Sequence, residues 1–217
     1  MTTSAIDLAS LLCSRLCHDL LSPVGALTNG LELLADEKDP DMRQKCFDLL
    51  EQSAKTSADK LRFFRLAFGA AGGFGETVPC AEARALVDAL VGNNGRIAIS
   101  WALAGETLPK PAVKTLLNLA LIAIDALVRG GTLDIAAETR VGDGGEVTEI
   151  VVRAAGARIA FDPTVGQALD GSLPAAELSS KTAPAAMIQQ LAASLGGAIQ
   201  VHLAPEALIL GAVLPVG

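Results

Sequence analysis

The sequence of 217 residues has few aromatic side chains and few charges. It contains no tyrosine and one tryptophan, aromatic residues make up 3% of it, and charged residues make up 19%. The apolar fraction of 51% is that of a globular chain, which excludes a disordered tail or a fibrous repeat. Because the core must then be built from Ala, Leu, Val and Ile, we expect helices that pack through small side chains.

Positive charge is also scarce. The chain has 17 Lys and Arg against 24 Asp and Glu, which gives a net charge of −7. An acidic surface repels the phosphate backbone of DNA and RNA, and so few aromatic rings offer no platform on which bases could stack. We therefore expect no nucleic-acid partner.

Long hydrophobic runs are missing as well. The longest, residues 119–124, is bounded by Asn118 and Asp125 and is far shorter than the roughly 20 apolar residues that span a bilayer. The first 21 residues lack the basic start of a secretory signal and carry three charges inside their apolar part. The four cysteines are accordingly expected to be reduced thiols. The sequence predicts a cytoplasmic protein with no membrane partner.

Two long amphipathic helices are predicted in the N-terminal third. Leucines recur at helical spacing over residues 5–35, a polar turn follows at 35–40, and a second apolar stripe runs over residues 41–68. Two long helices joined by a short turn form an antiparallel hairpin. Because a hairpin leaves one apolar face uncovered, we expect two copies to form a four-helix bundle in a homodimer.

A glycine-rich segment, residues 71–79, is predicted to be a linker between a hairpin of residues 1–70 and a second domain of residues 80–217. The predicted helices of this domain cover residues 80–91, 110–128 and 182–195. The predicted strands cover residues 96–103, 132–139, 146–155, 198–203 and 206–214. This order favours an α/β sandwich with helices on one face of a mixed sheet, so the whole chain is of the α+β class.

The sequence contains only two histidines, and their settings differ. His202 lies in a strand-like segment and is interpreted as structural. His18 lies on the first helix, where it shares a face with small or polar residues and one leucine. These neighbours are Leu11, Ser14, Ser22, Gly25 and Asn29. Such a face lets another folded protein approach the imidazole.

Asp19 follows His18 directly and can bind one imidazole nitrogen, which leaves the other nitrogen as a nucleophile. Pro23 removes one helical hydrogen bond and is expected to bend the helix just past the histidine. A metal site is the weaker alternative, because Cys13 and Cys17 share one face of the helix whereas His18 points about a quarter-turn away.

The segment HDLLSPV at residues 18–24 resembles the phosphoacceptor box of the dimerisation and phosphotransfer domain of sensor histidine kinases. That box reads His, an acidic residue, Leu, a variable and often basic residue, then Thr, Ser or Asn, and Pro. The matching residues are His18, Asp19, Leu20, Ser22 and Pro23. Leu21 replaces the residue that is often basic.

The second domain resembles the ATP-binding domain of the same kinases, but it departs at four positions. Ile122 stands where an Asn of the N box would hold magnesium and phosphates. In the adenine box, Ala154 replaces the Asp that reads adenine and Arg158 replaces a glycine, while Pro184 stands at a glycine position of the lid. Ile122 supplies no oxygen for magnesium and Ala154 no acceptor for adenine. The resemblance therefore implies a degenerate ATP-binding domain that does not bind ATP.

Residues 5–217 together resemble the histidine phosphotransferases of bacterial phosphorelays, of the ChpT type. The resemblance implies that His18 accepts a phosphoryl group from a receiver-domain aspartate of a hybrid histidine kinase. His18 then passes it to receiver aspartates of response regulators, and Asp19 orients the ring. The residues expected to contact these receivers are Leu11, Ser14, Arg15, Leu21, Ser22 and Gly25. The chain is expected to bind no cofactor and no metal, because the receiver brings magnesium and a lysine that this chain lacks near His18.

Two other functions stay open: an ATP-dependent histidine kinase core, against which the four departures argue, and a non-catalytic dimeric scaffold that only binds receiver domains. A basic group on the second helix is interpreted as a solvated face, with contact to an acidic receiver surface as the alternative. Its members are Lys55, Lys60, Arg62 and Arg65.

Overall fold

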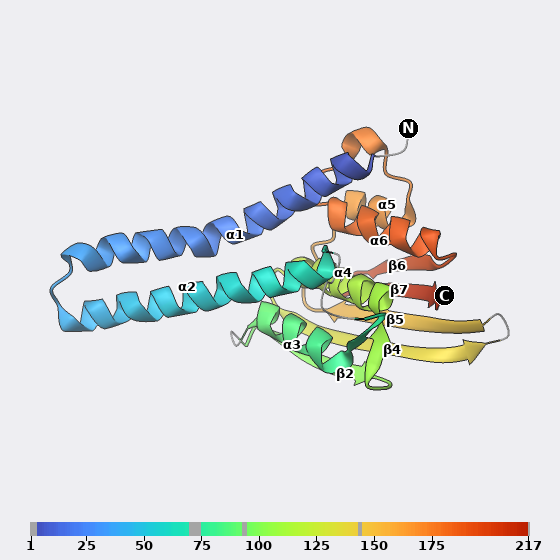
Figure 1. The fold of residues 1–217 in the computed structure, drawn as a ribbon, viewed down its shortest axis with the longest axis horizontal. Helices are drawn as coiled ribbons and strands as arrows, with labels where there is room; N and C mark the ends of the chain where they lie inside the picture. Colours follow the sequence, from blue (N-terminus) through green and yellow to red (C-terminus); the bar gives the residue numbers. More distant parts are fainter. Residues whose placement is uncertain (1–3, 70–74, 93–94, 143–144, 217) are drawn as a thin grey trace.

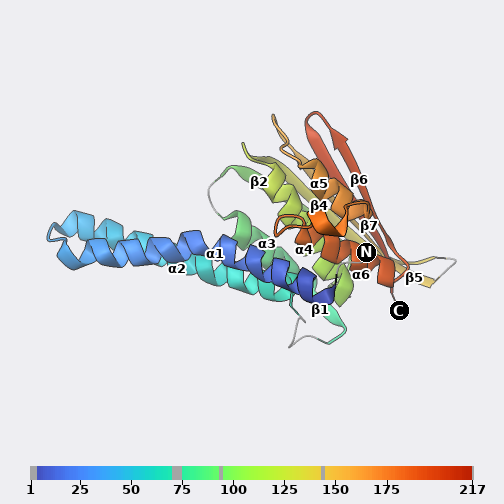
Figure 2. The ribbon, with the colours of Figure 1, turned by 90° about the horizontal axis from the view of Figure 1, so that it is seen from above.

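The computed structural model describes residues 4–69, 75–92, 95–142 and 145–216. A long helical hairpin extends from an α/β part in which helices cover one face of a mixed sheet (Figures 1 and 2). The expected α+β class and the order of its main elements are confirmed. Within the described ranges, no helix is long and apolar enough to span a bilayer.

The hairpin consists of α1 (Ala5–Asp36) and α2 (Pro40–Ala67), which run side by side in opposite directions (Figure 1). Side chains that accept hydrogen bonds from unpaired backbone amides fix where each helix begins. Ser4 accepts from the Asp7 amide at the start of α1, and Asp39 caps α2. The tight turn between them leaves α1 and α2 as antiparallel neighbours, as the sequence predicts.

The sheet of the α/β part has the strand order β2-β4-β5-β7-β6. The bounds are β2 (Ile97–Leu103), β4 (Gly131–Gly142), β5 (Gly145–Ala155), β6 (Ala198–Ala204) and β7 (Ala207–Pro215). β2 pairs with β4 in parallel and the other pairs are antiparallel, so the sheet is mixed. The helices on its covered face are α3 (Cys80–Val91), α4 (Lys110–Ala126), α5 (Pro163–Asp170) and α6 (Ala183–Ser194), with a short 3₁₀ turn at Ala175–Glu177.

Some elements differ from the expectation. Residues 77–79, placed in the linker, form β1 (Thr77–Pro79), which pairs with β3 (Thr107–Pro109) because Val78 and Leu108 are buried there. Residues 71–74 of that linker lie outside the described residues. α5 was not predicted, although its Asp-Pro-Thr start is a typical helix signal: Asp162 accepts from the Thr164 amide and Pro163 occupies the first turn.

The base of the hairpin and the α/β part share one hydrophobic core. Phe63 and Phe64 of α2 are fully buried in this core beside residues of α4 and the sheet. A polar contact reinforces the junction, because the buried Asn118 of α4 donates from Nδ2 to the Ala67 carbonyl oxygen at 3.1 Å. The base of the hairpin is therefore fixed against the α/β part, while its far end extends away (Figure 2).

Candidate functional site: the His18 imidazole and its contacts

His18 presents its imidazole to solvent from α1, and its side chain is 81% exposed. Nδ1 lies 3.2 Å from Oδ1 of Asp19. Because an ionised carboxylate can only accept, this contact in a neutral ring places the proton on Nδ1 and leaves the lone pair on Nε2. The geometry thus leaves Nε2 as an accessible nucleophile.

Asp19 is held in place by a second contact. Its Oδ2 accepts from Nε of Arg15 at 2.8 Å, and Nη2 of Arg15 donates to Oδ2 of Asp125 on α4, also at 2.8 Å. Arg15 and Asp19 have only 13% and 16% of their side chains exposed. Burial lowers the pKa of Arg15, but Asp125 and Asp19 outweigh it and raise that pKa above its ordinary value. A charged arginine therefore links the hairpin to the α/β part.

Asp19 makes a third contact, through its backbone carbonyl, with a side chain of α2, and Pro23 explains why that carbonyl is available. The amide of residue 23 would normally donate to the Asp19 carbonyl oxygen, four residues earlier, but proline has no N–H. Nζ of Lys60 donates to that carbonyl oxygen instead, at 2.8 Å. The prediction that Lys60 belongs to a solvated face is therefore wrong, because its Nζ bonds the backbone of α1. The sequence signal that could have indicated this contact is Pro23, because a proline inside a helix leaves the carbonyl four residues earlier without its donor.

The expected docking residues fall into two groups. Four lie at or near the surface within two turns of His18: Ser14, Leu21, Ser22 and Gly25. Gly25 has open space where a Cβ would project. Leu11 is half-buried and packs on the shared core. Arg15 is not available to a docked protein, because both of its bonded carboxylates belong to this chain and little of its side chain is exposed.

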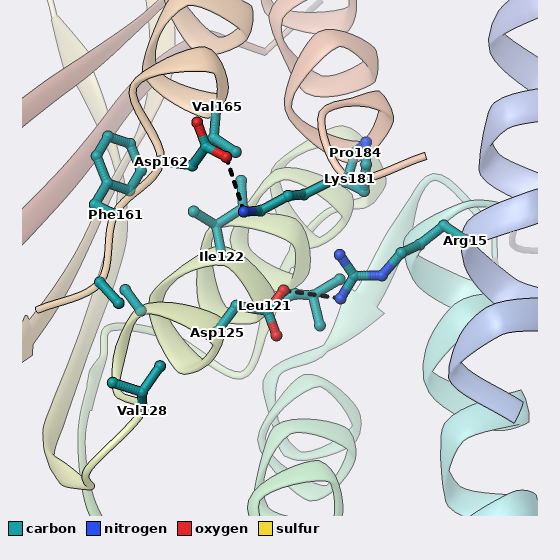
Figure 3. A pocket seen from close by; sticks show the side chains of 12 residues that line it. Arg15, Leu121, Ile122, Asp125, Val128, Phe161, Asp162, Val165, Lys181 and Pro184 are labelled. Carbon is teal, nitrogen blue, oxygen red and sulfur yellow. Dashed lines mark hydrogen bonds and ion pairs between the residues drawn. The ribbon is translucent and has the colours of Figure 1, made fainter. Parts of the chain in front are cut away.

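A cavity of about 190 Å³ adjoins the Arg15–Asp125 pair, between α1, α4, α5 and α6 (Figure 3). Ile122 and Pro184 both line it. Ala154 does not line it, because its side chain is buried within β5, and Arg158 is exposed beyond the end of that strand. Of the four positions at which the sequence departs from the kinase ATP-binding motifs, the structure thus brings two together.

A second ion pair lines the same cavity. Nζ of Lys181 donates to Oδ2 of Asp162 at 2.8 Å (Figure 3). This bond, together with hydrogen bonds from the Thr164 hydroxyl and amide, lowers the pKa of Asp162 to about 2. The charged groups in the cavity wall are therefore paired with one another, Lys181 with Asp162 and Arg15 with Asp125.

The remaining candidate residues lie apart from this network. His202 is exposed on the edge strand β6 of the sheet rather than on the hairpin. Cys13 and Cys17 are exposed thiols on α1. In the part of the chain that the structure describes, no group of three or more His, Cys, Asp or Glu side chains is arranged to hold a metal ion.

Comparisons with known proteins agree with these features. Residues 80–207 match the histidine phosphotransferase C-terminal domain. The chain is 34% identical over 212 residues to the protein phosphotransferase ChpT of Brucella abortus (strain 2308), and the alignment covers 98% of each chain. It is also similar to the solved structure of a bacterial phosphotransferase, with a TM-score of 0.82, 32% identity and 98% of each chain covered. A histidine kinase domain from Erythrobacter litoralis EL346 has a TM-score of 0.48 and 13% identity, with 89% of this chain and 94% of that one covered.

The match to the C-terminal domain spans more than half of the chain, and the similarity to ChpT runs over nearly all of it. The similar bacterial phosphotransferase has the same arrangement of hairpin and α/β part. On these grounds the chain belongs to the histidine phosphotransferase family and is a phosphorelay-type protein of the ChpT group.

Proposed function

We propose that this chain carries phosphoryl groups between receiver-domain aspartates through a phosphohistidine formed at Nε2 of His18. One observation carries the proposal: an imidazole that is 81% exposed donates Nδ1–H to a carboxylate that is itself bonded to Arg15. An exposed, oriented Nε2 suits a nucleophile that reacts inside another protein's active site. The relationship to a named protein phosphotransferase supports the same reaction.

The proposed step conserves atoms and charge. Nε2 attacks the phosphorus of an aspartyl phosphate in a docked receiver, the N–P bond forms, and the P–O bond to the aspartyl carboxylate breaks. The ring gains positive charge while Nδ1 keeps its proton, and the carboxylate of Asp19 stabilises that charge. The reverse step on a second receiver returns the phosphoryl group to an aspartate. The receivers would supply the magnesium and the lysine that neutralise the phosphoryl oxygens.

We further propose that the chain uses no ATP. The cavity between α4 and α6 measures about 190 Å³, whereas pockets for small organic ligands usually span about 300–1,000 Å³. Ile122 and Pro184 line it; the Ile122 side chain supplies no metal-binding oxygen, and Pro184 has no backbone N–H. Titration with ATP and magnesium should therefore give no saturable heat, and clear binding would favour the kinase alternative.

Pairing of two copies through the hairpin is part of this proposal. The face of α1 turned away from α2 carries exposed small and apolar residues at helical spacing: Cys17, Leu21, Val24, Thr28 and Leu31. The far end of the hairpin is a single layer of two helices (Figure 2), and a second hairpin would cover this stripe as a four-helix bundle does. The C₂ partner of such a bundle is another copy of the same surface.

The experiment is a transfer assay with a phosphorylated receiver domain as donor. We expect acid-labile, base-stable label on the wild-type protein and on His202→Ala, because His202 lies on β6. His18→Ala should take up no label. Binding of the receiver without any label on the wild-type protein would instead support the scaffold alternative, and label on His18→Ala would refute the assignment.

A further inference from the structure

The ring of His18 is oriented by a line of side chains that starts in the α/β part. Nη2 of Arg15 bonds Asp125 on α4, Nε of Arg15 bonds Asp19, and Asp19 accepts from Nδ1 of His18. Figure 3 shows Arg15 reaching from α1 to Asp125. Among the described side chains, Asp19 is the one that hydrogen-bonds the His18 ring. The orientation of the nucleophile therefore depends on how firmly Asp19 is held.

Arg15 holds Asp19 through the shape of its guanidinium. The planar fork presents Nε and Nη2 in fixed relative directions, so fixing one end on Asp125 aims the other end at Asp19. Both bonds are 2.8 Å long. Oδ2 of Asp19 is thereby occupied, and Oδ1 is left to face His18. A lysine at position 15 would keep the charge but could not reproduce this two-point geometry.

The position of Asp125 gives a second, independent reason to assign it a role. It lies in the last turn of α4, where the helix has no basic residue and its dipole disfavours a negative charge. Its side chain is 49% exposed, and among the described residues Arg15 is its ion-pair partner. The dipole of α4 therefore disfavours a carboxylate at this place, whereas the contact with α1 stabilises it.

We infer that Asp125 is a positioning residue for phosphotransfer: through Arg15 and Asp19 it sets the orientation and tautomer of His18. The predicted effect on the transfer rate rests on the proposed function of His18. Asp125 thereby gives the α/β part a share in the reaction although that part does not touch the phosphoryl group. A purely structural role would instead confine Asp125 to holding α1 against α4.

The test compares Asp125→Asn with Asp134→Asn. The control removes one carboxylate from another partly exposed ion pair, Arg153–Asp134 on the sheet. In the free protein, ¹⁵N spectra of the His18 ring should show loss of the single Nδ1–H tautomer in Asp125→Asn and an unchanged ring in the control. In single-turnover transfer, Asp125→Asn should be slower by about tenfold, the effect of losing one charged hydrogen bond, with an unchanged KM for the phosphorylated receiver.

A double variant separates positioning from structure. If Asp125 acts through Asp19, the variant Asp19→Asn/Asp125→Asn should be no slower than Asp19→Asn alone. If the two substitutions instead slow transfer independently, so that their rate factors multiply in the double variant, the inference is overturned. An unchanged His18 spectrum and transfer rate in Asp125→Asn would also overturn it. The spectra need no receiver, so they test the role of Asp125 even if the wild-type protein transfers no phosphoryl group. That absence of transfer would overturn the proposed function instead.

Discussion

At the scale of single residues, the site is a histidine whose two nitrogens have different surroundings. Nδ1 faces the carboxylate of Asp19, and Nε2 faces solvent on a side chain that is 81% exposed. The box His-Asp-Leu-x-Ser-Pro predicts this pair directly, since adjacent positions place the carboxylate beside the ring. What the sequence does not show is that Arg15, expected to contact a receiver, instead bonds Asp19.

The role of Asp19 can be tested by the variant Asp19→Asn. An amide is neutral and can also donate, so it neither stabilises the positive phosphohistidine ring nor selects the Nδ1–H tautomer. We expect transfer from a phosphorylated receiver to slow by about 10²-fold, within the range for positioned acid–base groups. Rapid-mix label transfer measures this rate, and Asp59→Asn on α2, whose ion-pair partners are Lys55 and Arg62, is the control. A rate within about threefold of the wild type would contradict the role given to Asp19.

At the scale of helices, α1 is shaped around Pro23. Proline leaves the Asp19 carbonyl without its helical donor, and Lys60 of α2 supplies one from the neighbouring helix. α1 changes direction in its middle part (Figure 1), as a proline inside a helix causes. The backbone beside His18 is thus held by a side chain 41 residues away in the sequence.

This pairing predicts a conditional effect of Lys60→Met, which keeps most of the aliphatic stem and removes the donor. We expect the free energy of unfolding to fall by about 1–2 kcal/mol, the cost of an unsatisfied carbonyl. In the Pro23→Ala background the backbone amide gained at position 23 can donate to the Asp19 carbonyl, so the same change should cost less than half as much. Urea denaturation at one protein concentration measures both differences.

Lys55→Met is the matched control for that cycle. Lys55 lies on the same helix and pairs with Asp59, and the Lys55 side chain is itself 72% exposed; pairs of such an exposed cation contribute about 0–1 kcal/mol. Its cost should therefore be small and the same in both backgrounds. An equal cost of Lys60→Met in the wild-type and Pro23→Ala backgrounds would show that Lys60 does not replace the missing amide.

The start of α5 predicts a pH dependence of stability. Lys181 and Thr164 lower the pKa of Asp162 from 3.8 to about 2. A lowered pKa means that the ionised carboxylate stabilises the fold above about pH 4, and that this stabilisation is lost as the pH falls toward 2. Asn can still cap a helix, so Asp162→Asn removes mainly the charge.

We expect Asp162→Asn to be less stable than the wild type at pH 7. The difference should shrink as the pH is lowered from 4 toward 2, because Asp162 is then protonated in the wild type as well. Urea denaturation at pH 7, 4.5 and 3 measures it. A difference that stays constant over this range would contradict the lowered pKa of Asp162.

The elements themselves follow closely from sequence patterns. The two long helices and the five strands of the mixed sheet lie where periodicity and glycine placement predict them. Short elements fixed by tertiary contacts were missed: β1 and β3 form because Val78 and Leu108 bury side chains together. Contacts between distant segments, such as Lys60 with Asp19 and Arg15 with Asp125, have no local pattern and needed the structure.

At the scale of the whole molecule, the hairpin and the α/β part act as one body. Phe63 and Phe64 of α2 are fully buried in the core they share with α4 and the sheet. The site lies close to this junction, where Arg15 and Asp125 meet. A receiver docked at His18 would therefore meet a surface of fixed shape, with the exposed stripe of α1 left for a second copy.

The proposed dimer predicts a change of mass on placing charges in the exposed stripe of α1. Val24→Glu/Leu31→Glu should convert the wild-type dimer to a monomer in light scattering, because pairing would bury two carboxylates without partners. Val141→Glu, at an exposed position near the end of β4, is the control and should stay dimeric. A monomeric wild type, or a dimeric double variant, would exclude pairing through this stripe.

The proposed transfer forms one bond between nitrogen and phosphorus. The measurement labels the histidines of the wild-type protein with ¹⁵N, phosphorylates the protein with a phosphorylated receiver domain, and records the ¹⁵N–³¹P coupling. We expect a single coupling, to Nε2 of His18, because Nδ1 donates to Asp19 in the free protein. A coupling to Nδ1, a coupling to His202, or phosphorus on a residue other than histidine would contradict this.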